Sequence, residues 1–128
     1  MVEGRVDRNF EAFIELDLVL DDRVERERFL VDTGFNGFVA VSRSLADRHG
    51  LIVTDTQQGV TADGNESYFD VVWLTILWHE MPMRIQAQVL DEPLIGSRLL
   101  RGSRIQADWI PDGLIQVTPL DESGSESP

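Results

Sequence analysis

The stretch FLVDTGFNG, residues 29–37, decides the fold, because three apolar residues run directly into Asp32, Thr33 and Gly34. A second apolar run, FVAV at 38–41, follows this loop. Apolar runs on both sides predict that one buried strand delivers the polar triplet to a loop and that a second, short strand leaves it. Taken alone, the triplet also fits a simple turn, in which the aspartate caps a backbone N–H and the glycine adopts a positive φ. The surrounding sequence has to distinguish between these two interpretations.

The residues before the loop predict a pair of strands. In the second half of the segment 10–20, apolar Ile14, Leu16, Leu18 and Leu20 recur at every second position, as they do in a strand with one buried face. Turn-forming residues at 21–23 follow, and the segment 24–31 begins charged and ends apolar. We therefore expect the chain to enter the core as it approaches the loop.

The residues after the loop predict a short helix. Ser42 or Ser44 can cap its N-terminus, because a serine hydroxyl accepts a hydrogen bond from a backbone N–H of the first turn. The segment Leu45–His49 then supplies the helical residues, and Gly50 is a typical C-terminal stop.

A hairpin is predicted next. The segment 51–56 is compatible with a strand, and the segment 57–68 is polar and contains Asp63, Gly64 and Asn65, which are typical of a hairpin tip. We expect this hairpin to be mobile.

The C-terminal half of the chain predicts further strands, so the domain is expected to be mostly β. Its segments are rich in β-branched and aromatic residues or alternate between apolar and polar positions. The predicted strands are 69–78, 83–90, 105–109 and 114–117, with an apolar run at Leu94, Ile95 and Gly96 and one or two helical turns at 97–100. Residues 121–128 are rich in Ser and Glu and lack apolar side chains, which predicts a disordered acidic tail after one domain at 1–120.

Composition excludes several classes of partner and chemistry. The 128 residues fit one domain, and 23 acidic against 11 basic residues give a net charge of −12, which disfavours nucleic acid and anionic membranes. No run approaches the roughly 18 apolar residues of a membrane helix, and the first residues lack the apolar stretch of a signal peptide, so a cytoplasmic location is expected. The chain has no cysteine, and its two histidines, His49 and His79, are far apart, so we expect neither a disulfide nor a metal site nor any cofactor.

Two motifs together resemble the retropepsin-like (retroviral-type) aspartic protease family. The first is FLVDTGFNG at 29–37, and the second is LIGSRLL at 94–100. In that family an apolar strand delivers an Asp-Thr/Ser-Gly loop, a glycine-bearing hairpin covers the cleft as a flap, and an apolar-apolar-Gly segment with a short helix packs behind the loop. The resemblance spans residues 13–117 and implies an all-β, closed β-barrel-like acid protease fold with one or two short helices and one lobe per chain.

The resemblance also implies roles for individual residues. Asp32 would be the catalytic residue, and Thr33 would hydrogen-bond across a dimer axis. Gly34 would let backbone approach the substrate, and Gly96 would let the rear segment pack closely behind the loop. The hairpin tip at Asp63, Gly64 and Asn65 would be the flap, although an ordinary exposed hairpin is an alternative.

Phe35 departs from the family pattern, in which a small residue often follows the triplet. A bulky side chain here would narrow the cleft or form the wall of a substrate subsite. The acidic tail is a second departure, because it is poorly suited to the interleaved terminal strands of viral subunits. The dimer contact is therefore expected within 105–117. Three tryptophans, Trp73, Trp78 and Trp109, are interpreted as core or interface residues.

The chemistry explains why a dimer is expected. Peptide hydrolysis without a metal or a covalent nucleophile needs a base to activate water and an acid to protonate the amide, and two close carboxylates sharing one proton supply both. This chain has one suitable triplet, since Asp63-Gly64 and Asp112-Gly113 lack the hydroxyl residue and the preceding apolar strand. The second Asp32 must come from another copy in a two-fold homodimer, with an acidic pH optimum.

The sequence therefore predicts an aspartic endopeptidase that acts on extended peptide or protein substrates as a homodimer. Two alternatives stay open. The first is a non-catalytic dimeric peptide-binding module on the same fold, since a fold does not dictate an activity. The second is a small β-barrel of unrelated function, which a monomeric mass in solution would favour.

Overall fold

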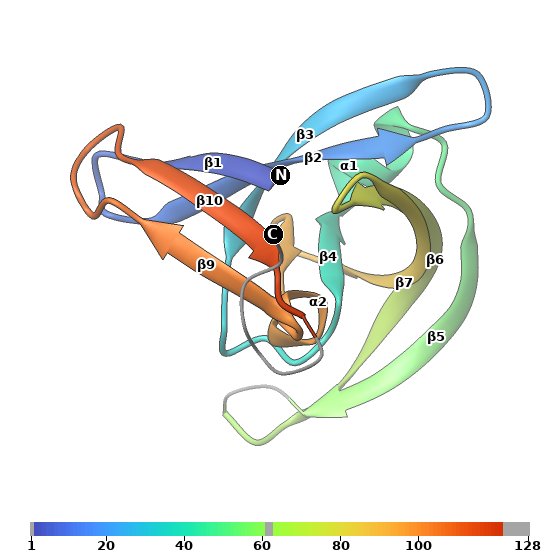
Figure 1. Ribbon diagram of the computed structural model, residues 1–128. Helices are drawn as coiled ribbons and strands as arrows, with labels where there is room; N and C mark the ends of the chain where they lie inside the picture. Colours follow the sequence, from blue (N-terminus) through green and yellow to red (C-terminus); the bar gives the residue numbers. More distant parts are fainter. Residues whose placement is uncertain (1, 61–62, 122–128) are drawn as a thin grey trace.

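The computed structural model describes residues 2–60 and 63–121 (Figure 1). Within this part of the chain, ten strands form one sheet and two short helices accompany it, so the all-β prediction is confirmed. The predicted tail at 121–128 falls outside the described residues except for Asp121. The elements are β1 Val2–Val6, β2 Ala12–Val19, β3 Val24–Val31, β4 Val39–Ser42, α1 Arg43–Arg48, β5 Val53–Val60, β6 Glu66–Trp78, β7 Met81–Leu90, β8 Leu94–Ile95, α2 Ser97–Leu100, β9 Ser103–Ala107 and β10 Leu114–Pro119.

The antiparallel hairpin of β2 and β3 follows from the alternation in the sequence. Ile14 and Leu18 lie on the inner face of β2 and are fully buried. Asp17 lies on the outer face, where its Oδ1 accepts a hydrogen bond of 3.1 Å from Nε of Arg26 on β3. Ile14 pairs with Phe29, so the inner face of β3 becomes buried just before the chain reaches Asp32.

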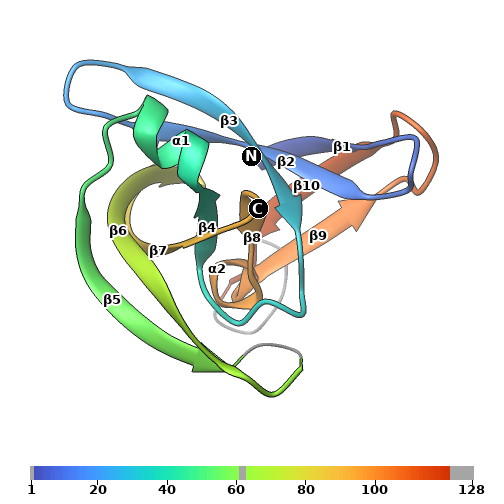
Figure 2. The same cartoon turned by 180° about the vertical axis from the view of Figure 1, so that it is seen from behind.

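The strands close into a ring. The sheet order is β5-β6-β7-β4-β8-β3-β2-β1-β10-β9, and β2 also pairs with β6 through Leu18↔Ile76 and Val19↔Thr75. This additional pairing closes a ring of β6, β7, β4, β8, β3 and β2, which Figures 1 and 2 show from opposite sides. β5 lies at one free end of the sheet, and β1, β10 and β9 form an extension at the other.

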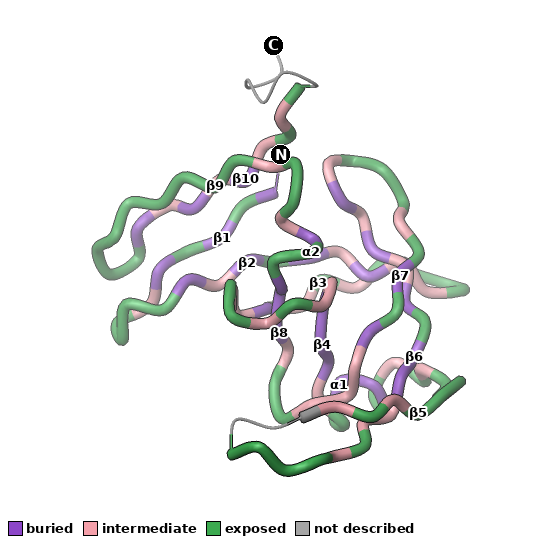
Figure 3. The backbone as a smooth tube through the Cα atoms, turned by 90° about the horizontal axis from the view of Figure 1, so that it is seen from below, coloured by how far each residue is buried: buried purple, intermediate pink, exposed green. Residues whose placement is uncertain are grey.

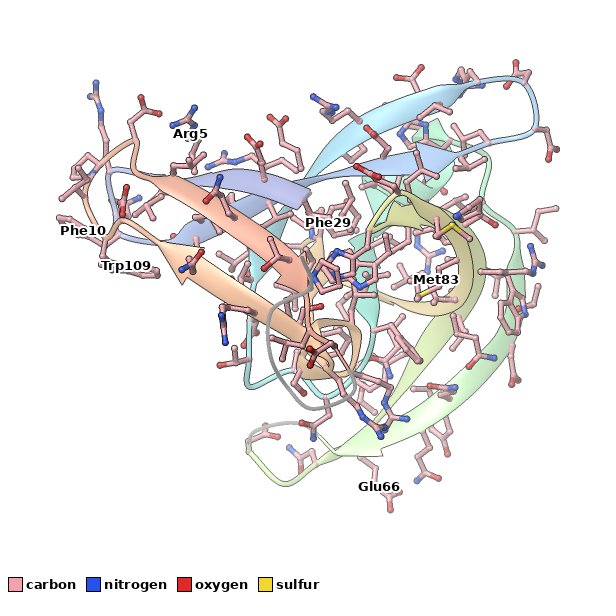
Figure 4. The ribbon with its side chains drawn as sticks, in the orientation of Figure 1. Arg5, Phe10, Phe29, Glu66, Met83 and Trp109 are labelled. Carbon is pink, nitrogen blue, oxygen red and sulfur yellow. The ribbon has the colours of Figure 1, made fainter. Side chains whose placement is uncertain are left out.

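Aliphatic and aromatic side chains fill the interior. Phe29 lies inside the ring (Figure 4), and Trp78 and Leu45 belong to the same buried cluster. The purple segments of Figure 3 show that this buried face continues along β1 and β10. Among the described residues, none that is polar or charged is buried. The interior therefore consists of hydrophobic packing, and polar chemistry is confined to the loops and outer faces.

The short helix α1 begins where the sequence predicts a cap. Oγ of Ser42 accepts a hydrogen bond of 3.1 Å from the backbone N–H of Leu45, which identifies Ser42 as the N-cap. His49 ends the helix, and its Nε2 lies 2.8 Å from Oε1 of Glu27 on β3. Arg48 Nη2 donates to the same carboxylate oxygen at 2.5 Å. These polar contacts fix the C-terminal end of α1 against β3.

The strand β1 was not predicted. Its buried positions alternate with exposed ones, and it pairs with both β2 and β10. Because β10 returns to pair with β1, the N-terminal strand is satisfied within its own chain.

Several predicted strands, among them those that correspond to β5, β6, β7, β9 and β10, differ from the observed strands in their bounds. β5 extends to Val60, through residues expected to be loop, because it pairs with β6 as far as Glu66. The turn between β6 and β7 is reduced to His79 and Glu80, both with positive φ, which is the backbone of a two-residue hairpin. β9 ends at Ala107, since the backbone turns where Ile110 N–H donates to Asp108 O at 2.8 Å.

No helix in the described part of the chain is both long enough and apolar enough to cross a membrane.

Candidate active site

Asp32 stands at the end of β3 and is anchored by the neighbouring strand β8. β3 and β8 run parallel, with Val31 opposite Ile95, and the backbone N–H of Asp32 donates to Ile95 O at 2.9 Å. Two residues earlier on both strands, Leu30 N–H donates to Pro93 O at 3.0 Å. The apolar run before the triplet and the later LIG segment are therefore paired side by side.

The carboxylate of Asp32 is held at one oxygen. Its Oδ1 accepts a hydrogen bond of 3.0 Å from the backbone N–H of Gly34, and its carbonyl accepts one of 3.1 Å from Phe35 N–H. The residue is partly exposed, and within the described residues Oδ2 accepts no hydrogen bond. One oxygen is thus fixed by the loop, whereas the other is open to water or to a second group.

Thr33 is exposed at the surface of the loop. Its predicted hydrogen bond would go to another copy of the chain, so a single chain does not test it. Gly34 is likewise exposed, and a Cβ built on it would lie 3.3 Å from Oδ1 of Asp32, closer than most real Cβ contacts. A side chain at position 34 would therefore press on the carboxylate.

The rear of the loop is a tight contact between Gly96 and the residues after the triplet. A Cβ on Gly96 would overlap the carbonyl oxygen of Gly37 and would lie 2.7 Å from both the ring and the carbonyl oxygen of Phe35. Two hydrogen bonds hold the contact together: Gly96 N–H donates to Phe38 O at 3.0 Å, and Ser97 N–H donates to Phe35 O at 2.9 Å. No side chain fits at position 96 without moving the loop.

The ring of Phe35 packs inward against these two glycines. A Cβ on Gly37 would lie 2.5 Å from one carbon atom of the ring, and a Cβ on Gly96 would lie 2.7 Å from another. The side chain thus forms part of the packing that supports the loop. It is also partly exposed, so its predicted contact with substrate stays a prediction.

Two supporting residues were missed from the sequence. Oγ of Ser97 lies 3.3 Å from Phe35 O, to which it donates, and Nε of Arg98 donates to Asn36 O at 3.3 Å. The guanidinium of Arg98 also lies 5.7 Å from the centre of the Phe38 ring. Both residues follow Gly96 directly, and their polar character next to an apolar run was the available signal.

The predicted flap residues lie on a separate hairpin. Asp63, Gly64 and Asn65 are exposed between β5 and β6, and Asp63 accepts hydrogen bonds from the Asn65 backbone N–H at 3.1 Å and side-chain amide at 3.0 Å. Residues 61 and 62 lie outside the described part of the chain. In Figures 1 and 2 this hairpin extends to the same end of the molecule as the loop between β3 and β4.

Two grooves lie elsewhere on the molecule. One of about 1070 Å³ is lined by outer-face residues of β1, β2 and β3, and one of about 610 Å³ lies between the end of α1 and strands β5 and β6. Asp32 lines neither groove.

The tryptophans divide between the core and the surface. Trp78 is buried in the core, as interpreted from the sequence, whereas Trp73 and Trp109 are exposed. The described residues contain no group of three or more His, Asp or Glu side chains that could hold a metal ion.

No family model, curated protein or solved structure matches this chain. Its function must be inferred from the chemistry of the loop. A single carboxylate with one fixed and one open oxygen can accept a proton from water, but it cannot protonate the carbonyl oxygen in the same step. A single chain therefore presents one carboxylate at this loop, with Oδ1 fixed and Oδ2 open.

Proposed function

We propose that the chain is one subunit of a retropepsin-like aspartic endopeptidase, active as a homodimer in which two Asp32 residues share one proton. One observation carries the proposal: the single Asp-Thr-Gly triplet is presented at the surface by a loop with a fixed Oδ1 and an open Oδ2. The close packing of Gly96 behind the loop also supports the proposal, because catalytic groups must be held in position before the substrate arrives. The strand ring and the pairing of β3 with β8 are consistent with a retropepsin fold.

The proposed reaction needs one ionised and one protonated carboxylate. The ionised Asp32 takes a proton from water while the oxygen of that water forms a bond to the scissile carbonyl carbon. The protonated Asp32 of the other copy donates its proton to the carbonyl oxygen, which gives a gem-diol. The first Asp32 then donates the proton it took from water to the amide nitrogen, while the second Asp32 takes one proton back from a gem-diol hydroxyl. The C–N bond then breaks to release an amine and a carboxylic acid. Two close carboxylates resist double ionisation, so the pair titrates as a unit and favours an acidic optimum.

An extended peptide or protein segment is the proposed substrate. The loop lies at the end of the molecule to which the β5–β6 hairpin also extends (Figure 2). Closure of this hairpin over a bound peptide would exclude water and add backbone hydrogen bonds, as strand addition does. Phe35 and the hairpin tip would then contact the substrate.

Cleavage of a peptide library between about pH 4 and 7 tests the proposal. Wild type should cut, and Asp32→Asn should not, because the amide cannot exchange a proton as a carboxylate does. Asp112→Asn is a matched control, since Asp112 is an exposed loop aspartate with a positive φ that asparagine also tolerates. Cleavage that survives in Asp32→Asn contradicts the proposal.

A non-catalytic peptide-binding module is the second candidate, and the polar, exposed strand β5 favours it. β5 lies at a free end of the sheet, where a peptide can add as a further strand. A statine-containing peptide separates the two functions, because it mimics the tetrahedral intermediate. Binding that is lost in Asp32→Asn supports catalysis, whereas binding that is unchanged by this substitution supports capture at the edge.

A further inference from the structure

Within the described residues, the strand β9 has an unpaired edge at the opposite end of the sheet from β5. Among the described strands it pairs only with β10. Asp108 N–H donates to Leu114 O, and Leu120 N–H donates to Gly102 O, so Gly102 and Asp108 are both hydrogen-bonded positions of the β9–β10 pair. Because bonded and non-bonded positions alternate along an antiparallel pair, Ser103, Ile105 and Ala107 direct their backbone N–H and C=O groups away from β10.

The same three residues also continue the buried face of the sheet past the point where the core ends. Ile105 pairs with Val117 and Ala107 pairs with Ile115, so their side chains share a face. Val117 and Ile115 are each 0% exposed, but Ile105 is 42% exposed. In Figure 3, β9 is mostly green while the adjacent β10 contains purple segments. The side chains of Ile105 and Ala107 are therefore exposed next to a row of open backbone groups, whereas Oγ of Ser103 lies 2.8 Å from Nε2 of His79.

Further apolar surface follows directly after β9. Trp109 is 56% exposed and Ile110 is 61% exposed, and Figure 4 shows Trp109 beyond the end of β9. Exposed edge strands are normally protected by a central charge, a proline or a bulge. β9 instead has isoleucine at its centre, with Arg104 and Gln106 on the opposite face. We define the β9 edge surface as Ile105, Trp109 and Ile110.

We propose that β9 pairs antiparallel with β9 of a second copy, across a two-fold axis at Ile105, so that one sheet runs through both subunits. Ser103 then lies opposite Ala107 of the other copy, and Ile105 lies opposite itself. All three outward-directed residues find partners in this register, which gives about six new backbone hydrogen bonds. The inference rests on the proposed function only in that both require a dimer, and it names the surface that forms it.

A second copy fits this edge better than an unrelated partner because the segment is complementary to itself. Arg101 precedes β9 and Trp109 follows it by the same number of residues from Ile105. An antiparallel pair centred on Ile105 brings the basic start of each segment to the end of the other copy's β9 at which Trp109 stands, and a guanidinium near an indole ring is favourable. The segment begins with the basic residues Arg101 and Arg104 and ends with the acidic, exposed Asp108, so its two ends carry opposite charge.

The position of β9 also connects this edge to the candidate site. β9 begins three residues after α2, and the first residue of α2, Ser97, contacts Phe35 in the Asp32 loop. Figures 1 and 2 both show the beginning of β9 beside α2 and the loop between β3 and β4. The pairing edge is thus on the side of the chain where Asp32 needs its partner.

A cysteine cross-link tests the axis directly, since the wild-type chain has no cysteine. In the proposed register the two Cα atoms of residue 105 are about 5.5 Å apart, within the range of a disulfide. Under mild oxidation Ile105→Cys should give a covalent dimer in high yield. Val24→Cys, at an exposed position of the β2–β3 hairpin, should stay mainly monomeric on a denaturing gel. Equal yields, or a higher yield from Gln106→Cys than from Ile105→Cys, would overturn the proposed axis.

Ile105→Pro provides an independent test by sedimentation. Proline removes an N–H that points away from β10, so the β9–β10 pair keeps its hydrogen bonds, and edge strands tolerate proline there. The variant should sediment as a folded monomer at concentrations at which wild type is a dimer, and Ile105→Lys should do the same. A dimer that persists in both variants refutes the inference.

Cleavage assays on the same proteins separate this inference from the proposed function. If wild type cleaves peptide and the position-105 variants stay dimeric and active, the interface is wrong and the protease proposal stands. If the variants become monomeric but wild type shows no cleavage, the interface is right and the protease proposal fails. If wild type is itself a monomer at high concentration, both fail.

Discussion

Among substitutions that add one methyl group near the candidate site, Gly96→Ala should destabilise the chain most. The new Cβ would meet backbone and ring atoms on both sides, namely the carbonyl oxygens of Gly37 and Phe35 and the Phe35 ring. None of the backbone atoms can rotate away as the end of a flexible side chain can. The loop and the rear segment must therefore separate.

The expected magnitude follows from these contacts. Forcing a methyl group into a well-packed site costs about 1–3 kcal/mol. Separating the segments also weakens the hydrogen bonds from Gly96 N–H to Phe38 O at 3.0 Å and from Ser97 N–H to Phe35 O at 2.9 Å, each worth about 1 kcal/mol. We expect a loss of about 3 kcal/mol in the free energy of unfolding.

Urea unfolding at a fixed protein concentration measures this loss. With a slope of about 2 kcal/mol per molar urea, the midpoint should fall by about 1.5 M. Gly50→Ala is the matched control, because Gly50 has φ +65° and no atom within 4 Å of the added Cβ. It should lose only the backbone strain of a left-handed residue, about 1 kcal/mol. The fixed concentration matters because dimerisation adds to the measured stability.

A Gly96→Ala variant that unfolds at the same urea concentration as Gly50→Ala, or higher, would refute the close packing behind the loop. In a folded Gly96→Ala sample, peptide cleavage should fall at least about 100-fold, because small displacements of catalytic groups have effects of that size. Gly50→Ala should keep wild-type cleavage.

Three further predictions concern the framework around the site. Phe29→Ala should lower the free energy of unfolding by about 3–5 kcal/mol in chemical denaturation, because this fully buried ring fills the interior; a loss below about 1 kcal/mol would contradict its place in the core. Ser42→Ala should lose about 1 kcal/mol with the α1 cap, whereas Ser42→Thr should retain most of it. Burial raises the pKa of Glu27, but hydrogen bonds from His49 and Arg48 outweigh burial and leave the pKa below its ordinary value of 4.5. The ionised Glu27 therefore stabilises the fold above pH 4.5, and this contribution is lost as the pH falls through the lower folded pKa. Between pH 6 and 3 the melting temperature of Glu27→Gln should consequently fall less than that of wild type. Equal falls in the two proteins would contradict the pairing of Glu27 with His49 and Arg48.

Much of the framework could be predicted because its burial is regular. The alternation of apolar and polar residues in β2 determines which of its faces is buried, and β6 and β7 are rich in residues that favour strands. The hydroxyl of Ser42 marks the start of α1. The site loop could be located because an apolar strand leads into Asp32 and a second apolar segment ends at Gly96. Both features are local in sequence.

The remaining differences arise from tertiary contacts that local sequence does not encode. β5 continues through polar residues to Val60 because β6 supplies a partner strand along its length. The turn at His79 and Glu80 adopts two positive φ angles without the asparagine or glycine that usually signals them. β1 alternates between buried and exposed positions, but its five residues are stabilised as a strand by β2 and β10 on either side.

The supporting contacts of the site were equally hidden. Ser97 and Arg98 act through backbone carbonyls of the loop far away in sequence, and only the fold brings them together. The inward packing of Phe35 depends on the two glycines that face it. A sequence motif therefore located the carboxylate, whereas the groups that hold it in place required the structure.

Mixing wild type with Asp32→Asn subunits is the measurement that tests the shared pair of aspartates most directly. If each active site needs Asp32 from both chains, an equal mixture with free subunit exchange leaves about half of the wild-type chains in wild-type dimers, because pairing in a symmetric homodimer is random. Cleavage per wild-type chain should then fall to about half, and further as the inactive subunit is added in excess. Cleavage that stays proportional to the amount of wild type, whatever the excess of Asp32→Asn, would show that one Asp32 suffices and would contradict the account.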